Sequence, residues 1–193
     1  MTHPPASIDW GPILLRIARG AIAEKLGMAA PPVPTAAWLE EPAATFVTLH
    51  RLGQLRGCMG TLEPRRPLGE DVAENARQAA FHDPRFPPLA RSEFTDLQVE
   101  VSLLSALEPL PFNSQAQLLT LLRPGEDGLV LEWQGLRGAF LPQVWDQLPE
   151  PGDFLAHLKR KAGLPMAFWD DGIRTTRFTV TRFHEEAEVG SPG

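Results

Sequence analysis

The sequence predicts an α+β protein whose sheet is largely antiparallel and flanked by helices, and three observations support this fold class. Helical and alternating patterns of apolar residues are mixed along the chain, without the regular strand-helix-strand rhythm of a parallel sheet. Two strand-like segments fold back across short glycine-containing turns, which is typical of antiparallel hairpins. The 193 residues are 43% hydrophobic and include 16 Gly and 20 Pro, a composition that suits a globular core rather than a disordered chain.

The N-terminal region predicts one amphipathic helix over residues 8–27 and a proline-rich linker over residues 28–37. Ser7 suits the start of this helix as a cap, and Gly27 suits its end. Three prolines within four positions of the linker remove backbone donors, so the helix cannot continue there. The apolar residues at helical spacing are Ile13, Leu14, Ile17, Ala18, Ala21, Ile22 and Leu26.

The core of the protein is expected over residues 44–183, and its first element is a hairpin. Two β-prone runs within residues 44–61 surround a turn at residues 52–54, which places Gly57 and Gly60 at the far end of the second strand. Residues 68–82 then repeat apolar side chains at helical spacing, and the proline-rich segment HDPRFPPL ends this helix.

Residues 97–103 alternate apolar and polar side chains, which predicts a half-buried strand with Glu100 on its polar face. Asn113 or Ser114 suits the cap of a short helix that contains residues 118–122, and residues 124–128 (PGEDG) form a turn.

The last third of the core predicts a second hairpin, with its turn at Gln134 and Gly135. Helices are expected over residues 143–148 and 154–162, and one long strand over residues 172–183. Residues 186–193 contain little to bury and are expected to fray. We therefore expect a single domain over residues 1–185.

Charge and composition exclude several classes of protein. The chain carries 18 basic and 24 acidic residues, and its net charge of −6 argues against binding to nucleic acid or to anionic lipid. Cys58 is the single cysteine, so one chain has neither an internal disulfide nor an all-cysteine metal site, which suits a reducing compartment. No apolar run reaches the roughly 20 residues of a spanning helix. We expect a cytoplasmic protein without a membrane span.

The segment LRGCMG over residues 55–60 is the first candidate for chemistry. Gly57 and Gly60 allow close backbone approach or unusual backbone angles, and the guanidinium of Arg56 would favour the thiolate form of Cys58 and attract an anion. The alternative is a buried structural cysteine, which is the commoner fate of an isolated Cys.

The segment HDPRF over residues 82–86 is the second candidate. His82 could carry a proton, Asp83 could orient it, and Arg85 could hold a carboxylate or phosphate; the alternative is a simple helix end. Glu100 is either a solvated strand residue or a carboxylate that faces a cleft. The histidines show no metal-ligand spacing, so we predict no metal site, and the sequence does not identify a cofactor.

The order of several segments resembles the AMMECR family, whose microbial members are component A of AmmeMemoRadiSam systems. The similar segments are FVTLHRLGQLRGCMGTLEP, ENARQAAFHDPRFPPL, LQVEVSLLSALEPL, GLRGAFLPQVW and KAGLP, which lie between Phe46 and Trp169. The most specific motifs are LRGCxG and HDPRFPP, and Met59 stands where the family usually has Ile. The positions that match the characteristic motifs are Arg56, Gly57, Cys58, Gly60, His82, Asp83, Arg85 and Glu100.

This resemblance implies two subdomains around a cleft, and it implies Memo-like and radical-SAM proteins as partners. Our first hypothesis is an enzyme or substrate-handling component that binds a small anionic ligand, with Cys58 as nucleophile or redox group and His82 as base. The competing hypothesis is a non-catalytic adaptor or regulator of those partner proteins. Thiol reactivity of Cys58 in the folded protein separates the two.

Overall fold

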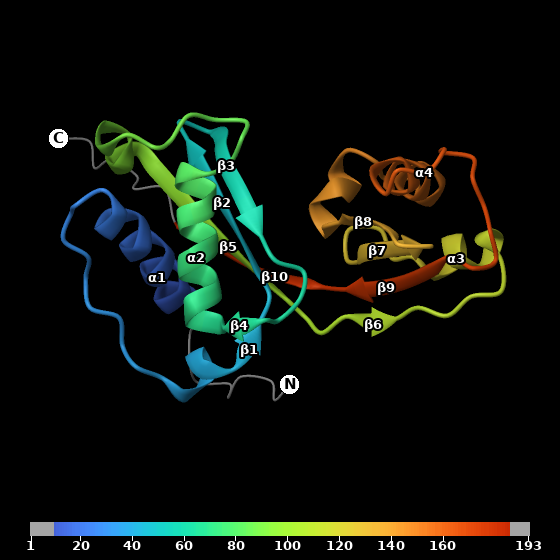
Figure 1. Cartoon of the computed structure of the whole chain (residues 1–193), viewed down its shortest axis with the longest axis horizontal. Helices are drawn as coiled ribbons and strands as arrows, with labels where there is room; N and C mark the ends of the chain where they lie inside the picture. The colour runs from blue at the N-terminus through green and yellow to red at the C-terminus, as the bar shows by residue number, and fades with distance from the viewer. Residues whose placement is uncertain (1–9, 186–193) are drawn as a thin grey trace. The chain divides into compact units, whose positions relative to one another are not determined.

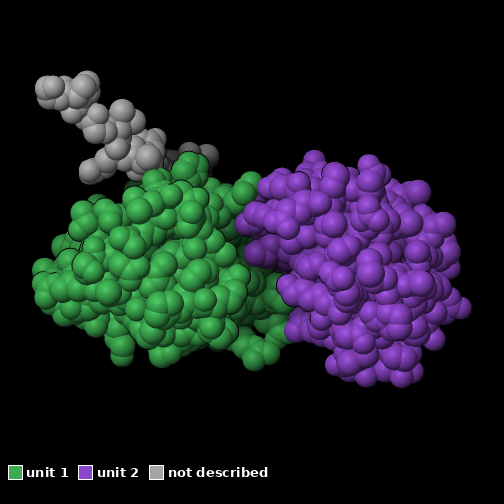
Figure 2. Space-filling view, turned by 90° about the horizontal axis from the view of Figure 1, so that it is seen from above, with its two compact units in different colours: residues 1–104, 181–193 green, residues 105–180 purple. Residues whose placement is uncertain are grey.

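The computed structural model describes residues 10–185, which form two compact units that each contain an antiparallel sheet (Figure 1). Within the described chain, unit 1 comprises residues 10–104 and 181–185, and unit 2 comprises residues 105–180; Figure 2 colours them green and purple. Each unit buries its own cluster of apolar side chains. The mixture of helices and antiparallel strands confirms the predicted α+β class.

Unit 1 contains a four-stranded sheet in the order β10-β5-β2-β3. These strands are β2 (Thr45–Arg51), β3 (Gln54–Gly60), β5 (Leu97–Leu104) and β10 (Val180–His184). Helices α1 (Trp10–Lys25) and α2 (Leu68–Phe81) pack against each other and against this sheet. Smaller elements are η1 (Ala37–Glu40), η2 (Arg91–Asp96) and the paired short strands β1 (Pro42–Ala43) and β4 (Arg66–Pro67).

Both helices of unit 1 cover the same face of the sheet, because alternate strand residues and helix residues share one core. Val47, Leu49 and Val101 are fully or almost fully buried in this core, together with Leu14 of α1 and Val72 of α2. Side chains alternate between the two faces of a strand, so the residues between them point to the opposite face. The pairing register of strands β2, β3 and β5 therefore determines which polar side chains lie together on the face that the helices do not cover.

Unit 2 contains a second sheet in the order β6-β9-β7-β8. Its strands are β6 (Glu108–Pro109), β7 (Gly128–Trp133), β8 (Leu136–Phe140) and β9 (Arg174–Phe178), and its helices are α3 (Gln115–Leu121), η3 (Pro142–Asp146) and α4 (Pro151–Lys161). The core includes Trp145 stacked on Phe154, with ring centroids 3.8 Å apart. Lys159 of α4 is also buried, and its ammonium donates to the carbonyl of Phe168.

Both predicted hairpins are confirmed, and their turns have the same backbone form. Leu52 and Gly53 have φ of 51° and 77°, and Gln134 and Gly135 have φ of 44° and 85°. Two consecutive positive φ angles match the twist of the flanking strands in a two-residue hairpin loop. Ser114 is confirmed as the cap of α3, because its hydroxyl accepts the backbone N–H of Gln117.

Two predicted elements are wrong in detail. Residues 172–183 are not one strand: β9 ends at Phe178 and belongs to unit 2, whereas β10 begins at Val180, the last residue of unit 2, and continues into unit 1. Thr179 lies at this break, where its carbonyl accepts the backbone N–H of Ser105. The helix expected over residues 143–148 is a 3₁₀ turn that starts at Pro142. The predicted Ser7 cap and the C-terminal tail over 186–193 lie outside the described residues.

Candidate functional site

Polar side chains line the face of the unit 1 sheet that helices α1 and α2 do not cover. Thr48 of β2 is paired directly with Cys58 of β3 on one side and with Glu100 of β5 on the other. Directly paired residues of antiparallel strands project to the same face, so these three side chains form one row. The hydroxyl of Thr48 donates to the Cys58 sulfur over 3.4 Å. All three residues are partly exposed, and Cys58 is a free cysteine.

The backbone of Cys58 is held at the outer edge of the sheet by the HDPRF segment. Strand β3 is the edge strand, and the N–H of Cys58 points outward to the carboxylate of Asp83, 2.9 Å away. The guanidinium of Arg85 reaches the Cys58 carbonyl at 3.5 Å and binds the Asp83 carboxylate through two nitrogens at 3.0 and 2.7 Å. This pair satisfies an edge that would otherwise expose unpaired backbone groups.

The carboxylate of Asp83 is ionised in this arrangement and has no free role as a proton acceptor. The pKa of Asp83 lies well below its ordinary value, chiefly because the Arg85 side chain donates hydrogen bonds to the carboxylate. The backbone N–H groups of Cys58 and Arg85 lower this pKa further. The same contact with Asp83 raises the pKa of Arg85. Asp83 therefore orients Cys58 rather than His82, which differs from the arrangement expected from the sequence.

The Asp83–Arg85 pair is called the clamp below, and Arg56 belongs to a second ion pair. Leu49 pairs with Gly57 and His50 with Leu55, so Arg56 is the extra residue of a β-bulge. Its guanidinium lies 2.9 and 3.0 Å from the two oxygens of Glu93 and also donates to the carbonyl of Pro87. The hydrogen bonds from Arg56, with a further one from the backbone N–H of Ala90, lower the pKa of Glu93 to about 2.

The two glycines of the motif are required by close approach, not by unusual backbone angles, because neither has a positive φ. A Cβ on Gly57 would lie 2.1 Å from the carbonyl oxygen of Ala79 in helix α2. A Cβ on Gly60 would lie 2.2 Å from the ring of Phe46 and 2.5 Å from the carbonyl oxygen of Thr45. Gly57 therefore lets helix α2 pack directly on the strand that carries Cys58.

Glu100 and His82, the other two predicted catalytic residues, make no hydrogen bond to the thiol. Glu100 is in the row of Cys58, but two strand spacings separate them, roughly 10 Å. His82 follows α2 and is exposed, and within residues 10–185 its ring makes no hydrogen bond or ion pair. A hollow of about 320 Å³ next to Glu100 is lined by His50, Gln98 and His184.

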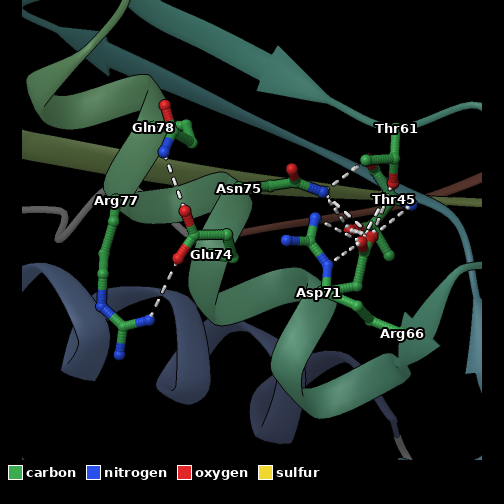
Figure 3. Close-up of polar contacts among 8 residues, drawn as sticks. All are labelled: Thr45, Thr61, Arg66, Asp71, Glu74, Asn75, Arg77 and Gln78. Atoms are coloured by element: carbon green, nitrogen blue, oxygen red, sulfur yellow. Dashed lines mark hydrogen bonds and ion pairs between the residues drawn. The ribbon is translucent and has the colours of Figure 1, made fainter.

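Sequence reasoning did not identify a buried polar cluster at the start of α2, which Figure 3 shows. The completely buried carboxylate of Asp71 accepts hydrogen bonds from the hydroxyls of Thr45 and Thr61, the amide of Asn75 and the guanidinium of Arg66 (Figure 3). These contacts join α2 to strand β2 and to the segment after β3. The helical spacing of Asp71 and Asn75 on the apolar face of the predicted helix was the available signal for this cluster.

Among the described residues, no group of three or more His, Cys, Asp or Glu side chains is placed to hold a metal ion. In this region, too, no helix is both long and apolar enough to cross a membrane.

The fold and this site define a two-unit α+β protein with a free thiol on a clamped edge strand. The model of the AMMECR1 family matches residues 15–183, and the chain belongs to that family. A protein of Methanothermobacter thermautotrophicus is 41% identical over 195 residues, covering 96% of this chain and all of that protein. Protein MJ0810 of Methanocaldococcus jannaschii is 40% identical over 153 residues, covering 75% of this chain and 74% of its own length.

The fold is also similar to a solved structure. The crystal structure of the uncharacterized protein PH0010 from Pyrococcus horikoshii superposes with a TM-score of 0.84 at 37% sequence identity. The match covers 94% of each chain.

Proposed function

We propose that the protein is a substrate-handling component that binds a small anionic molecule on the uncovered face of the unit 1 sheet, with the Cys58 thiol as its reactive group. The observation that carries this proposal is the row of Cys58, Thr48 and Glu100, in which Cys58 is partly exposed and its backbone is held by Asp83 and Arg85. A nucleophile on a rigid strand with fixed neighbours is positioned before a ligand arrives.

The two arginines have different roles in this proposal. The Arg56 side chain is only 10% exposed and binds Glu93 through two nitrogens, so it braces the site. The Arg85 side chain is 53% exposed beside Cys58, and its Nε and one terminal nitrogen bind Asp83. Its other terminal nitrogen supports Arg85 as the contact for an anion. His82 is still the predicted base, and Glu100 is still a predicted catalytic carboxylate.

Protection of the thiol tests this proposal. The full chain is treated with iodoacetamide at pH 7, and the mass of the intact protein reports modification of its single cysteine. We expect folded protein to react, and we expect at least one phosphate, dicarboxylate or nucleotide to slow the reaction several-fold. Arg85→Gln should abolish this protection. His82→Gln and Glu100→Gln should each change the pH profile of the reaction. Modification that requires unfolding, or that no anion slows, would contradict the proposal.

A second candidate function, an adaptor for Memo-like or radical-SAM proteins, is favoured by the tip of the β2–β3 hairpin. Leu52 is 77% exposed and Leu55 is 41% exposed at this tip. A leucine with positive φ is costly in a turn, which supports selection for contact with an apolar partner surface rather than for the turn itself. Leu52→Asn should weaken binding of a purified Memo-like partner measured by calorimetry, with Gln134→Asn in the other hairpin as the matched control. Equal affinities of the wild type and both variants would contradict the adaptor function at this tip.

A further inference from the structure

A second hollow lies in unit 1 between helix α1, the connector that follows it and the end of strand β10. Its volume is about 680 Å³, within the range of roughly 300–1,000 Å³ that small-molecule sites occupy. Its lining includes Leu15 and Arg16 of α1, Pro31 of the connector, and Arg182 and Phe183 of β10. Cys58, Thr48 and Glu100 are not part of this lining, which shares only His184 and Glu185 with the smaller hollow next to Glu100.

The hollow carries positive charge that is not neutralised within the described chain. Arg16 and Arg182 are exposed, and neither forms a hydrogen bond or ion pair with any of residues 10–185. Arg19 is different, because its guanidinium binds the carboxylate of Glu185 at 2.6 Å and the carbonyl of Leu97. The Arg19–Glu185 pair is neutral, which leaves two available guanidinium groups on a chain with a net charge of −6.

The base of the hollow is fixed before any ligand binds. Glu185 accepts the backbone N–H of Val99 as well as the guanidinium of Arg19, and its own N–H donates to the Val99 carbonyl. These bonds join α1, β5 and the end of β10 into one frame. A preformed frame lowers the ordering cost of binding.

Apart from His184, the remaining side chains of the lining are apolar. Leu15, Pro12, Pro31 and Phe183 present hydrocarbon and ring surfaces, and the prolines have restricted backbones. An inorganic anion alone would leave this apolar surface unused, while a neutral apolar molecule would leave both guanidinium groups without a partner. We infer that the hollow binds an organic anion, in which a carboxylate, sulfonate or phosphate meets Arg16 and Arg182 and an apolar body packs on Leu15 and Phe183.

Three probes test separately whether binding needs the negative charge and whether it needs the apolar body of the ligand. The full chain is titrated with naphthalene-1-sulfonate, with inorganic phosphate, and with 1-naphthol as the neutral analogue, and binding is followed by calorimetry and amide NMR shifts. We expect saturable binding of the sulfonate, with shifts at Leu15, Arg16 and Phe183, and at least tenfold weaker binding of phosphate and naphthol. The affinity of the sulfonate should fall with increasing salt concentration.

Variants assign the binding to the hollow. Arg16→Gln combined with Arg182→Gln should weaken sulfonate binding at least tenfold while the melting temperature stays close to that of the wild type, because both side chains are exposed. Arg91→Gln is the matched control, since Arg91 is another exposed arginine of unit 1 without a partner in residues 10–185 and lies outside the lining. The inference is overturned if the sulfonate does not bind, if phosphate binds equally well, or if the double variant binds like the Arg91 control. Cys58 alkylation does not enter this readout, so failure here is distinct from failure of the thiol proposal.

Discussion

Replacing Gly57 with alanine should disrupt the contact between strand β3 and helix α2. The new Cβ would lie 2.1 Å from the Ala79 carbonyl oxygen, whereas real Cβ contacts stay above 3.0 Å, so strand and helix must separate by about 1 Å. Overpacking in a core costs about 1–3 kcal/mol. The opposing atom is helix backbone rather than a flexible side chain, so we expect a loss of about 3 kcal/mol in the free energy of unfolding.

Urea denaturation followed by circular dichroism measures this loss, and with slopes of about 1–3 kcal/mol per molar the midpoint should fall by about 1–3 M. The matched control is Gly69→Ala in the first turn of the same helix. A Cβ there meets only the ordinary contact of Leu39 at 3.6 Å, so stability should stay constant or rise by up to about 1 kcal/mol. A Gly57→Ala protein that loses less than about 1 kcal/mol would refute the close-approach reasoning.

Three further predictions concern the clamp, the brace and the hairpin turns. The pKa of Asp83 in the folded protein lies below its ordinary value of 3.8, so its ionised form stabilises the fold above that pH, and this stabilisation is lost as the pH falls. Asp83→Asn should therefore flatten the decrease in melting temperature below pH 4. An unchanged pH profile would count against the Asp83–Arg85 clamp. Arg56→Gln removes the two-nitrogen partner of Glu93, which keeps only Arg51 at 3.5 Å and the backbone N–H of Ala90, and should cost about 1.5–3 kcal/mol in urea denaturation. The added substitution Glu93→Gln should restore part of this loss. Leu52→Asn and Gln134→Asn should each raise stability by about 0.5–1 kcal/mol, because asparagine tolerates positive φ; lower melting temperatures would contradict this.

Local patterns predicted the hairpins and helices because the signals lie within single elements. The turn at Gly53 and the helical spacing before His82 depend on neighbours in sequence, and both elements are present. The end of the strand at Phe178 was missed, because Thr-rich alternation continues across Thr179 while the two halves pair in different sheets. Pairing partners are tertiary information that alternation does not contain.

The composition of the candidate site was predicted only in part for the same reason. Counting back from the turn in a regular hairpin would pair Thr48 with Gly57, and the bulge at Arg56 moves the pairing by one residue to Cys58. The bulge also turns Arg56 toward Glu93, a partner 37 residues away that no local spacing indicates. The contact between Asp83 and Arg85 could be predicted from the sequence, because the two residues lie only two positions apart in one turn.

The placement of β10 has a consequence for biosynthesis. The edge of β5 that β10 covers stays open on the nascent chain until all of residues 105–180 have left the ribosome. Residues 105–180 do not behave as a flexible loop once unit 2 has folded, because Ser105 and Thr179 hold its two ends together. The N–H of Ser105 donates to the Thr179 carbonyl at 2.9 Å, and the N–H of Thr179 donates to the Ser105 hydroxyl at 3.0 Å. Once unit 2 has folded, its two ends lie side by side, so the last strand pairs without closing a long flexible loop.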